Sequence, residues 1–370
     1  MQDRTRWWEE RKQELISLAR ETGPVCVVNE EALNEIVFDL LSMGAVDELL
    51  FPVSLHAHPR MLDALGRVGA GFLCDSATDV DALGDSLPGR YASRVLLVGK
   101  EAVEAFGEPS DLDRVVLTVF DPETVSVRPD RFQGRVALVG IPAQQAQSGG
   151  GPGTDPLIEA LAEAGASVRG VYLPWGGRVP EKAAQEALNR WRGALGRDGI
   201  LTLGRGTGTA FDEETARLDP ERTAENVGEL RDLVDARAVW LDPGEHLFSE
   251  IGVLLVPVEK VFRSGERICV QMREGPAREI PGTLRRERVP VWNLTSNEGE
   301  GSIPVALCEP GEGGDSTAWT VLVSAVPKSE DILVLPLCGF PGAKRERGSS
   351  GFTERSVCYL NARRICQVPL

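Results

Sequence analysis

The chain has 370 residues, of which 42% are hydrophobic, so it is long enough for one large or two moderate domains with a sizeable core. Its 40 lysine and arginine residues are outnumbered by 56 aspartate and glutamate residues, which gives a formal net charge of −16. That charge repels a nucleic-acid backbone and an anionic membrane surface, so we expect neither as a partner.

The amino-terminal residues and the cysteines favour a cytoplasmic protein. Residues 1–23 read as a charged amphipathic helix and lack the apolar centre of a signal peptide. The sequence also has no apolar run long enough to span a membrane. The cysteines are scattered, odd in number and without a C-x-x-C pair, which predicts reduced thiols.

A regular alternation of short β-rich runs and helix-like segments begins near residue 30. Between the runs, leucine, alanine and valine recur at helical spacing. Eight such runs predict a (β/α)8 barrel over residues 29–244. The β-rich runs are residues 48–55, 70–76, 94–100, 114–121, 135–141, 167–173, 199–206 and 238–244.

The pattern changes after Gly244, where β-rich segments follow one another with only turn residues between them. Residues 245–370 are therefore predicted to form a β-domain. The run "PVCVV", residues 24–28, precedes the first barrel helix, and we expect residues 1–28 to join that domain as a helix and a strand. The expected fold class is α/β plus β: a TIM-like barrel with a carboxyl-terminal β-domain.

Five blocks occur in a characteristic order: "TGPVCVVNEEAL", "FPVSLHAHPRMLDALGRVGAGFLCDSATDVDAL", "LDPGEHLFSEIGVLLVPVEKV", "LCEPGEGGD" and "LPLCGFPG". Over about residues 20–370 the chain resembles the fold type III pyridoxal-phosphate (PLP) enzymes, which include the ornithine and diaminopimelate decarboxylases. The resemblance implies a decarboxylase and alanine-racemase-like architecture, a biosynthetic role, and a homodimer with its active site at the interface.

Four positions depart from the family's pattern. Ser54 stands where the family has the lysine that forms the Schiff base, and a hydroxyl cannot form an imine. The histidine that stacks on the cofactor falls near Pro174, and the arginine that binds its phosphate is Glu245. The tyrosine of the late block is Phe340. Covalently bound PLP is therefore not expected.

Other landmarks are retained. The resemblance places Asp242 where an acid pairs with the pyridine nitrogen, although an Asx-type turn before Pro243 is an alternative role. Cys308 and Glu309 match residues that a partner subunit contributes to the active site.

The sequence "GRGTG" keeps three glycines, Gly204, Gly206 and Gly208, in the place of the family's phosphate loop. Their backbone N–H groups suit an anion, and the same glycines equally suit a plain strand-to-helix turn.

The three histidines of the chain are His56, His58 and His246. If the first barrel strand continues through His58, both imidazoles of the H-x-H pair lie on one face. His246 follows the eighth strand, which neighbours the first in a closed barrel. With Glu245 or Asp242 nearby, this cluster suits Zn²⁺ or non-haem iron.

The histidines also leave other roles open. One imidazole suits an axial haem ligand, and a histidine can act as a general acid or base without a metal. His56 and His58 equally suit a loop that merely precedes Pro59. Cys74 and Cys308 are possible nucleophiles, and Cys74 also suits a buried strand position.

The sequence thus predicts a divergent decarboxylase-like enzyme for a small amino acid or amine-type metabolite, without a PLP Schiff base and with a histidine-based metal or haem site. The alternatives are a non-catalytic pseudo-decarboxylase that acts as a regulatory or dimer partner, and noncovalent PLP binding. The candidate catalytic residues are His56, His58, Asp242, Cys308 and Glu309; the cofactor-binding candidates are Ser54, Gly204, Gly206 and Gly208; the metal ligands are His56, His58, His246 and Glu245.

Overall fold

The computed structural model consists of two compact units. One runs from Glu35 to His246, and the other combines the residues up to Asn34 with segments that follow Leu247. The structure describes residues 7–42, 44–86, 94–106, 114–142, 155–174, 181–189, 191, 198–204, 220–272, 291–296, 303–308, 319–323, 325–336, 357–361 and 364–368.

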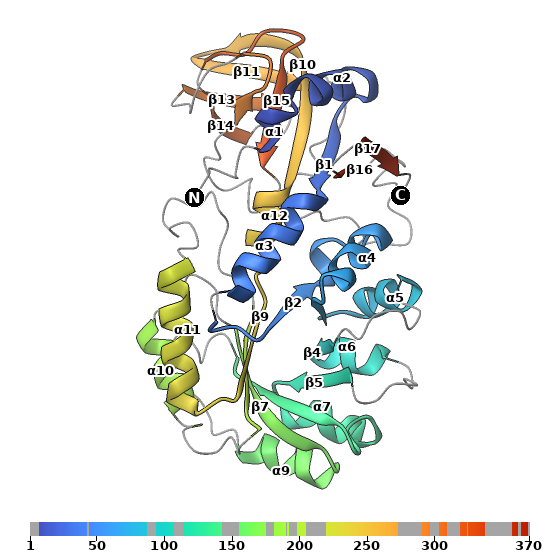
Figure 1. Cartoon of the computed structure of the whole chain (residues 1–370), viewed down its shortest axis with the longest axis vertical. Helices are drawn as coiled ribbons and strands as arrows, with labels where there is room; N and C mark the ends of the chain where they lie inside the picture. The colour runs from blue at the N-terminus through green and yellow to red at the C-terminus, as the bar shows by residue number, and fades with distance from the viewer. Residues whose placement is uncertain are drawn as a thin grey trace. The chain divides into compact units, whose positions relative to one another are not determined.

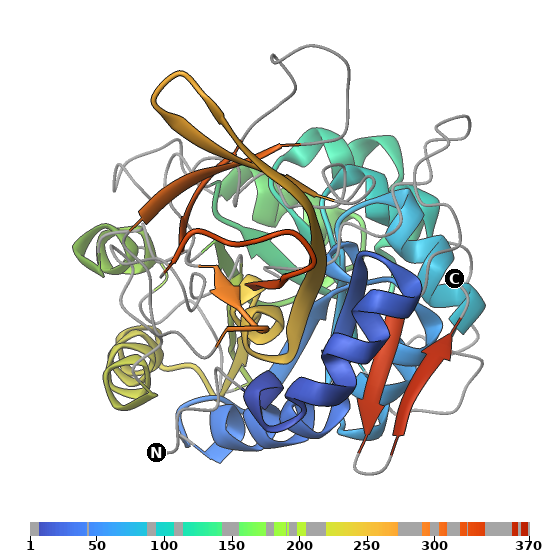
Figure 2. The same ribbon diagram turned by 90° about the horizontal axis from the view of Figure 1, so that it is seen from above.

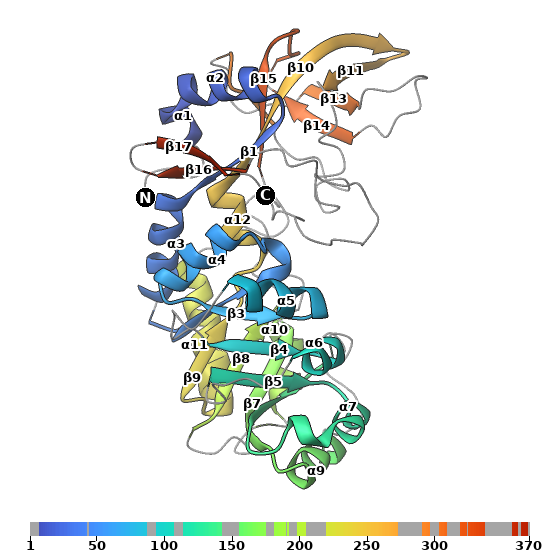
Figure 3. The ribbon, with the colours of Figure 1, turned by 90° about the vertical axis from the view of Figure 1, so that its right-hand side faces the viewer.

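The first unit is a closed barrel of eight parallel strands, which confirms the predicted architecture (Figures 1 and 3). The strands are β2 (Glu48–Pro52), β3 (Gly71–Cys74), β4 (Val95–Val98), β5 (Val115–Val119), β6 (Val136–Gly140), β7 (Ser167–Pro174), β8 (Ile200–Gly204) and β9 (Ala238–Leu241). The intervening helical elements are η2 (Val53–Leu55), α4 (Pro59–Arg67), α5 (Ala77–Ser86), α6 (Lys100–Ala105), α7 (Pro122–Val127), η4 (Pro129–Arg131), α9 (Asp155–Glu163), α10 (Glu181–Asn189) and α11 (Pro220–Val234).

The seam between β9 and β2 closes the barrel. Glu48 pairs with Trp240 there, and the Asp47 N–H donates to the Val239 carbonyl at 2.9 Å. The Asp47 carboxylate in turn accepts the Val239 N–H at 2.8 Å. One residue therefore satisfies both backbone groups of Val239 at the point where the two strands meet.

Inward-facing side chains fill the inside of the barrel, which we call the lumen. Leu50, Leu73, Leu96, Val98, Val116, Leu138, Tyr172 and Trp240 pack there as one cluster. Neighbouring strands of such a barrel are displaced by about one residue, so inward residues of alternate strands share a layer. The register places Thr202 with Leu50, Leu96 and Leu138, and the next layer toward the carboxyl ends holds Leu73, Thr118, Tyr172 and Asp242.

Glycines make room for two aromatic side chains at the carboxyl-terminal end of the lumen. A Cβ atom at Gly140 would lie 2.5 Å from the Phe120 ring, and one at Gly204 would overlap the Tyr172 hydroxyl. The Phe120 and Tyr172 rings meet edge to face with centroids 6.0 Å apart. The carboxyl-terminal end of the lumen is therefore covered by two aromatic rings that rest on glycines.

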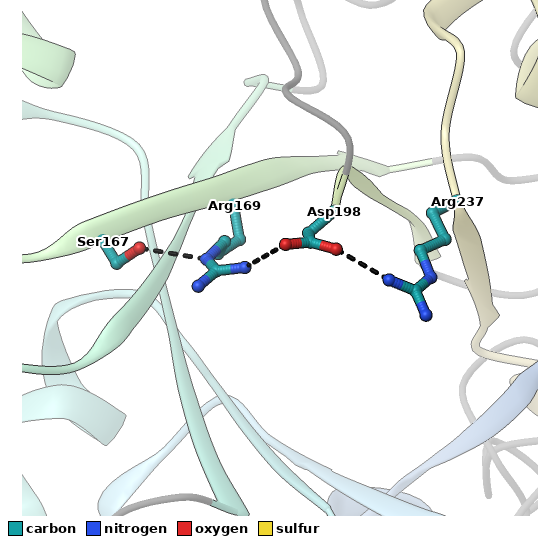
Figure 4. A network of polar contacts seen from close by, with 4 residues as sticks. All are labelled: Ser167, Arg169, Asp198 and Arg237. Carbon is teal, nitrogen blue, oxygen red and sulfur yellow. Dashed lines mark hydrogen bonds and ion pairs between the residues drawn. The ribbon is translucent and has the colours of Figure 1, made fainter.

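Charged groups close the opposite end of the barrel. The Arg94 Nε donates to the Glu48 carboxylate at 2.8 Å, and its guanidinium lies 4.4 Å from the centroid of the Trp240 ring. Nearby, the Asp198 carboxylate bridges Arg169 and Arg237 (Figure 4). The three side chains of this bridge are largely exposed, so each ion pair stabilises the fold by less than about 1 kcal/mol.

The second unit is built on a β-sheet with the strand order β14-β13-β11-β10-β1-β16-β17. Strand β15 pairs with β10, and β12 pairs with β15. The strands are β1 (Val25–Asn29), β10 (Gly252–Ser264), β11 (Arg267–Met272), β12 (Trp292–Asn293), β13 (Ile303–Cys308), β14 (Trp319–Val323), β15 (Ile332–Pro336), β16 (Val357–Asn361) and β17 (Arg364–Val368). Figure 2 shows β16 and β17 as a red hairpin, which the sequence analysis did not predict.

Strand β1 lies inside this sheet rather than at its edge. It pairs antiparallel with β10 and parallel with β16, and all five of its residues are buried. The remaining helices are α1 (Trp7–Glu10), α2 (Lys12–Thr22), α3 (Glu30–Ser42) and α12 (Glu245–Ile251). Among the described residues, no helix is long and apolar enough to cross a membrane.

Gly170 is the position where the barrel least tolerates a side chain. A Cβ atom there would overlap the Ile200 carbonyl oxygen on β8, so Gly170→Ala should destabilise the protein by about 3 kcal/mol. Gly84 on α5 is the matched control, because its Cβ would meet nothing within 4 Å, and Gly84→Ala should stabilise by about 0.5–1 kcal/mol. Denaturant unfolding of both variants measures the two effects. A Gly170→Ala protein as stable as the parent would contradict this account of the β7–β8 contact.

Candidate functional site

The segment that follows β2 carries two of the three histidines and Ser54. The β-rich run expected to reach residue 55 ends earlier, because β2 stops at Pro52 and a 3₁₀ turn, η2, follows it. The condition for a shared histidine face, a strand that continues through His58, is therefore not met, and the alternative of a loop before Pro59 holds. The His56 N–H closes this turn on the Val53 carbonyl at 3.1 Å. Pro59, whose φ angle suits the first turn of a helix, then begins α4. The two imidazoles therefore do not share a strand face.

His56 and His58 nevertheless remain close. Their ring centroids lie 6.0 Å apart and the ring planes are inclined by 41°. The His56 side chain is buried, and burial, together with the neighbouring His58, lowers its pKa to about 3. His56 is therefore a neutral imidazole throughout the physiological pH range.

His58 caps helix α4 with its side chain. Its Nδ1 atom accepts the Arg60 N–H at 3.2 Å. In a neutral imidazole only one nitrogen carries a proton, so this bond assigns the proton of His58 to Nε2. Nε2 is then a hydrogen-bond donor, and a metal could bind His58 only after the proton is lost or the cap is broken.

Ser54 lies in the middle of the η2 turn, and its side chain is exposed. The strand phase that places Leu50 in the lumen does not extend to it, because the backbone turns after Pro52.

A carboxyl pair at the end of the adjacent strand β3 was missed by the sequence analysis. The buried Asp79 carboxylate accepts the Asp75 N–H at 3.2 Å, while the Asp79 N–H donates to the Ser76 hydroxyl at 3.3 Å. Burial and the hydrogen bond to the Asp75 carboxyl raise the pKa of Asp79 from 3.8 to about 6. The pattern serine-x-x-aspartate before a helix is a capping signal that would have located Asp79.

Cys74 lies next to this pair and is fully buried in β3. Burial raises the pKa of its thiol well above 9.0, and the Asp79 and Asp75 carboxylates add to the effect. Because the thiolate is the nucleophilic form, Cys74 acts as a buried apolar residue. Turn η2 packs against both β3 and α5, so the histidine segment and the carboxyl pair are neighbours along the barrel rim.

Asp242 continues the inward phase of β9 and is buried. Its N–H donates to the Leu203 carbonyl at 2.8 Å, and its carboxylate accepts the Gly244 N–H at 2.7 Å. The second bond is that of an Asx turn, so the structural role considered for this residue is confirmed. One carboxylate oxygen of Asp242 is thereby fixed at the carboxyl end of β9.

Cys308 belongs to the second unit, where it ends β13. Its Sγ lies 3.5 Å from the Ala306 carbonyl oxygen, and it packs in one small cluster with Cys269. Burial and the hydrogen bond with the Cys269 thiol raise the pKa of Cys308 to about 11. The thiol is therefore protonated at neutral pH and is not an activated nucleophile.

The remaining predicted site residues fall partly or wholly outside the described residues. Gly206, Gly208 and Glu309 lie outside them, whereas Gly204 ends β8 against Tyr172. Glu245 and His246 begin α12, but their side chains are not described. In the described part of the chain, no three His, Cys, Asp or Glu side chains gather as metal ligands. The four-ligand metal centre stays a prediction, because two of its ligands are side chains outside that part.

Comparison with known proteins gives relatives by structure only. No protein-family model and no curated protein matches the sequence. A diaminopimelate decarboxylase from M. jannaschi is 14% identical, with 96% of this chain and 91% of that chain covered and a TM-score of 0.74. The arginine decarboxylase of Paramecium bursaria Chlorella virus is 14% identical over 95% of this chain and 100% of its own, with a TM-score of 0.70.

A lysine decarboxylase from Selenomonas ruminantium is 18% identical, with 91% of this chain and 93% of that chain covered and a TM-score of 0.67. These likenesses establish the decarboxylase-like fold, a closed barrel with a mostly β second domain.

The raised pKa of Asp79 predicts a specific pH dependence of stability. Because the folded state holds this proton more tightly than the unfolded chain, the stability it contributes is present below pH 3.8 and is lost as the pH rises through about 6. Asp79→Asn imitates the protonated carboxyl and can still accept the Asp75 N–H. The variant should therefore gain more stability over the parent at pH 8 than at pH 5.

Thermal unfolding at the two pH values measures this difference. Asp81→Asn is the control, because Asp81 is an exposed carboxylate on the same helix and should show no such difference. If both variants respond equally to pH, Asp79 does not carry the perturbed proton.

Proposed function

We propose that the chain is a divergent decarboxylase-like enzyme that acts on a small amino acid or amine-type metabolite at the mouth of its barrel, without a Schiff base to PLP. The observation that carries this proposal is the environment of Ser54. It is the residue assigned to the lysine position, and it presents a hydroxyl from an exposed 3₁₀ turn. A hydroxyl in that place can form no imine with an aldehyde cofactor.

The lumen side chains also fit PLP poorly. The Tyr172 hydroxyl lies directly against Gly204, the first of the three glycines that the resemblance assigns to the phosphate. A phosphate on the lumen side of Gly204 would therefore overlap the tyrosine. The proposed reaction therefore uses neither covalent nor noncovalent PLP.

Histidine acid–base chemistry is the reaction type that the described residues support. His58 presents a proton on Nε2 because its Nδ1 caps α4. His56 is buried beside it, and its low pKa keeps it from competing for that proton. In this proposal the His58 Nε2–H donates a hydrogen bond to the substrate, and His58 transfers a proton only from its imidazolium form, in which Nδ1 is protonated and the α4 cap is released. His56 helps to set the position of the neighbouring ring.

A metal ion or haem iron is the finer version of the same proposal. Its ligands would be His56, His246 and Glu245, and His58 would join them only if the α4 cap were released. A bound metal would act as a Lewis acid and would replace the pyridinium group as an electron sink.

A non-catalytic pseudo-decarboxylase, regulatory or a dimer partner, is the second candidate function. Two observations favour it. The Asp242 carboxylate is engaged in a turn, and the Cys308 thiol is kept protonated by a pKa of about 11. Both residues then serve the structure rather than a reaction.

We further propose a cytoplasmic homodimer in which Cys308 and Glu309 complete the active site of the partner subunit. The family resemblance supports this assembly, because it implies a homodimer with its active site at the interface. In a two-fold dimer both subunits contribute the same surface, so both active sites would be completed in the same way.

Two substitutions of His58 separate its chemistry from its capping role. Asparagine is a good N-cap residue, so His58→Asn keeps an acceptor for the Arg60 N–H, whereas His58→Ala loses both the cap and the imidazole. His58→Ala should be less stable than His58→Asn by about 1 kcal/mol. Both variants should lose turnover of amino acids and amines, measured by mass spectrometry of a substrate panel without added PLP.

Metal analysis of the wild type and of His56→Ala tests the metal version, because removal of a ligand histidine would lower the metal content. An active His58→Asn enzyme would exclude His58 as the proton donor. A wild type that turns over no member of the panel would favour the non-catalytic candidate.

The proposed assembly has its own test. Light scattering of the purified chain at micromolar concentration should give twice the chain mass of 40.0 kDa. A monomer under these conditions would rule out a site completed across the interface.

A further inference from the structure

Two buried hydroxyl groups point into the lumen without an evident structural role. Thr118 on β5 and Thr202 on β8 are both fully buried. Within the described part of the chain, neither Oγ1 atom has a hydrogen-bond partner. Leaving a buried hydroxyl unpaired costs about 1–3 kcal/mol, and valine would fill each position without that cost.

The register places these hydroxyls around the carboxyl-terminal half of the lumen. Thr118 shares a layer with Tyr172 and Asp242, and it faces Asp242 across the barrel because four strands separate them. Thr202 lies one layer deeper, beside Trp240 on the strand that carries Asp242. Two hydroxyls and one buried carboxylate thus surround the same short stretch of the lumen.

The charge of the side chains that line this stretch of the lumen determines which kind of ligand can bind there. Asp242 is 2% exposed, and the described inward positions of this half of the barrel include no lysine or arginine. An anion would be repelled by the carboxylate in a poorly screened interior. A primary ammonium group instead offers three donors, which match one carboxylate and two hydroxyl acceptors.

Two aromatic rings cover this region. The Phe120 and Tyr172 rings lie toward the carboxyl ends of the strands, and they rest on Gly140 and Gly204 rather than on side chains. Phe120 is only partly buried. A ligand that enters from the mouth of the barrel therefore requires these rings to rotate.

We infer that the lumen region lined by Thr118, Thr202 and Asp242 binds the ammonium group of a small primary amine, with Phe120 and Tyr172 as its cover. The inference deepens the proposed function, because it specifies where an amine-type substrate is held. It assigns recognition to the lumen and leaves proton transfer to the histidine segment at the rim.

Binding of cadaverine and n-pentylamine to the full-length protein tests the inference, with 1,5-pentanediol as a neutral match for chain length. Both amines should raise the melting temperature at millimolar concentration, and the diol should not. Thr118→Val and Thr202→Val should each weaken amine binding about tenfold or more, because each removes an acceptor for a charged donor. Each should also raise the melting temperature of the ligand-free protein by a few degrees.

Thr124→Val is the matched control. Thr124 is also buried, but its hydroxyl is bonded to the Asp121 carboxylate at 3.0 Å outside the lumen. This variant should lower the melting temperature and leave amine binding unchanged. The inference is overturned if the diol binds as well as the amines, if neither amine binds, or if the two lumen variants behave like the control.

The same assays separate this inference from the proposed function. His58→Asn should bind cadaverine as the wild type does, because His58 lies between η2 and α4 at the barrel rim and not among the side chains that line the lumen. Amine binding that depends on His58 and not on the threonines would reject the lumen site and retain the proposed function. Amine binding without turnover of any amine or amino acid would retain the lumen site and reject the proposed function.

Discussion

Closure of the barrel by the pairing of β9 with β2 is the constraint on which the rest of the first unit depends. Asp47 secures that seam by bonding both backbone groups of Val239, once through its own N–H and once through its carboxylate. Once the seam is closed, the register of all eight strands decides which side chains face inward and at which height. The mixed layer of Leu73, Thr118, Tyr172 and Asp242 is a direct consequence, and so is the choice of glycine at positions 140 and 204.

Hydrogen bonds in local turns and helix caps hold the polar side chains at the mouth of the barrel, and these bonds set the chemistry of those side chains. The His58 imidazole caps a helix and thereby has its proton fixed on Nε2. The Asp242 carboxylate closes a turn with one oxygen, and Asp79 shares its proton with Asp75. Each of these side chains is therefore held in one orientation, as a pre-organised site requires. What the mouth does not present is a lysine from β2, and the reaction proposed for it is correspondingly one of proton transfer without an imine.

The architecture could be predicted from the sequence because eight β-rich runs alternate with helical periodicity, and that pattern suits few folds. The β16–β17 hairpin was missed, since its strands carry a mixed pattern that no turn dipeptide marks. The shared histidine face depended on a strand that continues through His58, and β2 ends at Pro52. Asp79 could have been located from its serine-x-x-aspartate capping pattern, although its burial could not. The lumen threonines could not be found without burial and register, because a threonine in a β-rich run is ordinary until its hydroxyl is known to lack a partner among the described residues.

The proposed function depends most directly on the absence of a Schiff base between this chain and PLP. Full-length protein incubated with PLP, reduced with borohydride and weighed by intact mass spectrometry measures this in one experiment. The account predicts the unmodified mass of the 40.0 kDa chain. A stoichiometric pyridoxyl adduct on a single lysine would contradict it, because another lysine would then serve the role denied to Ser54.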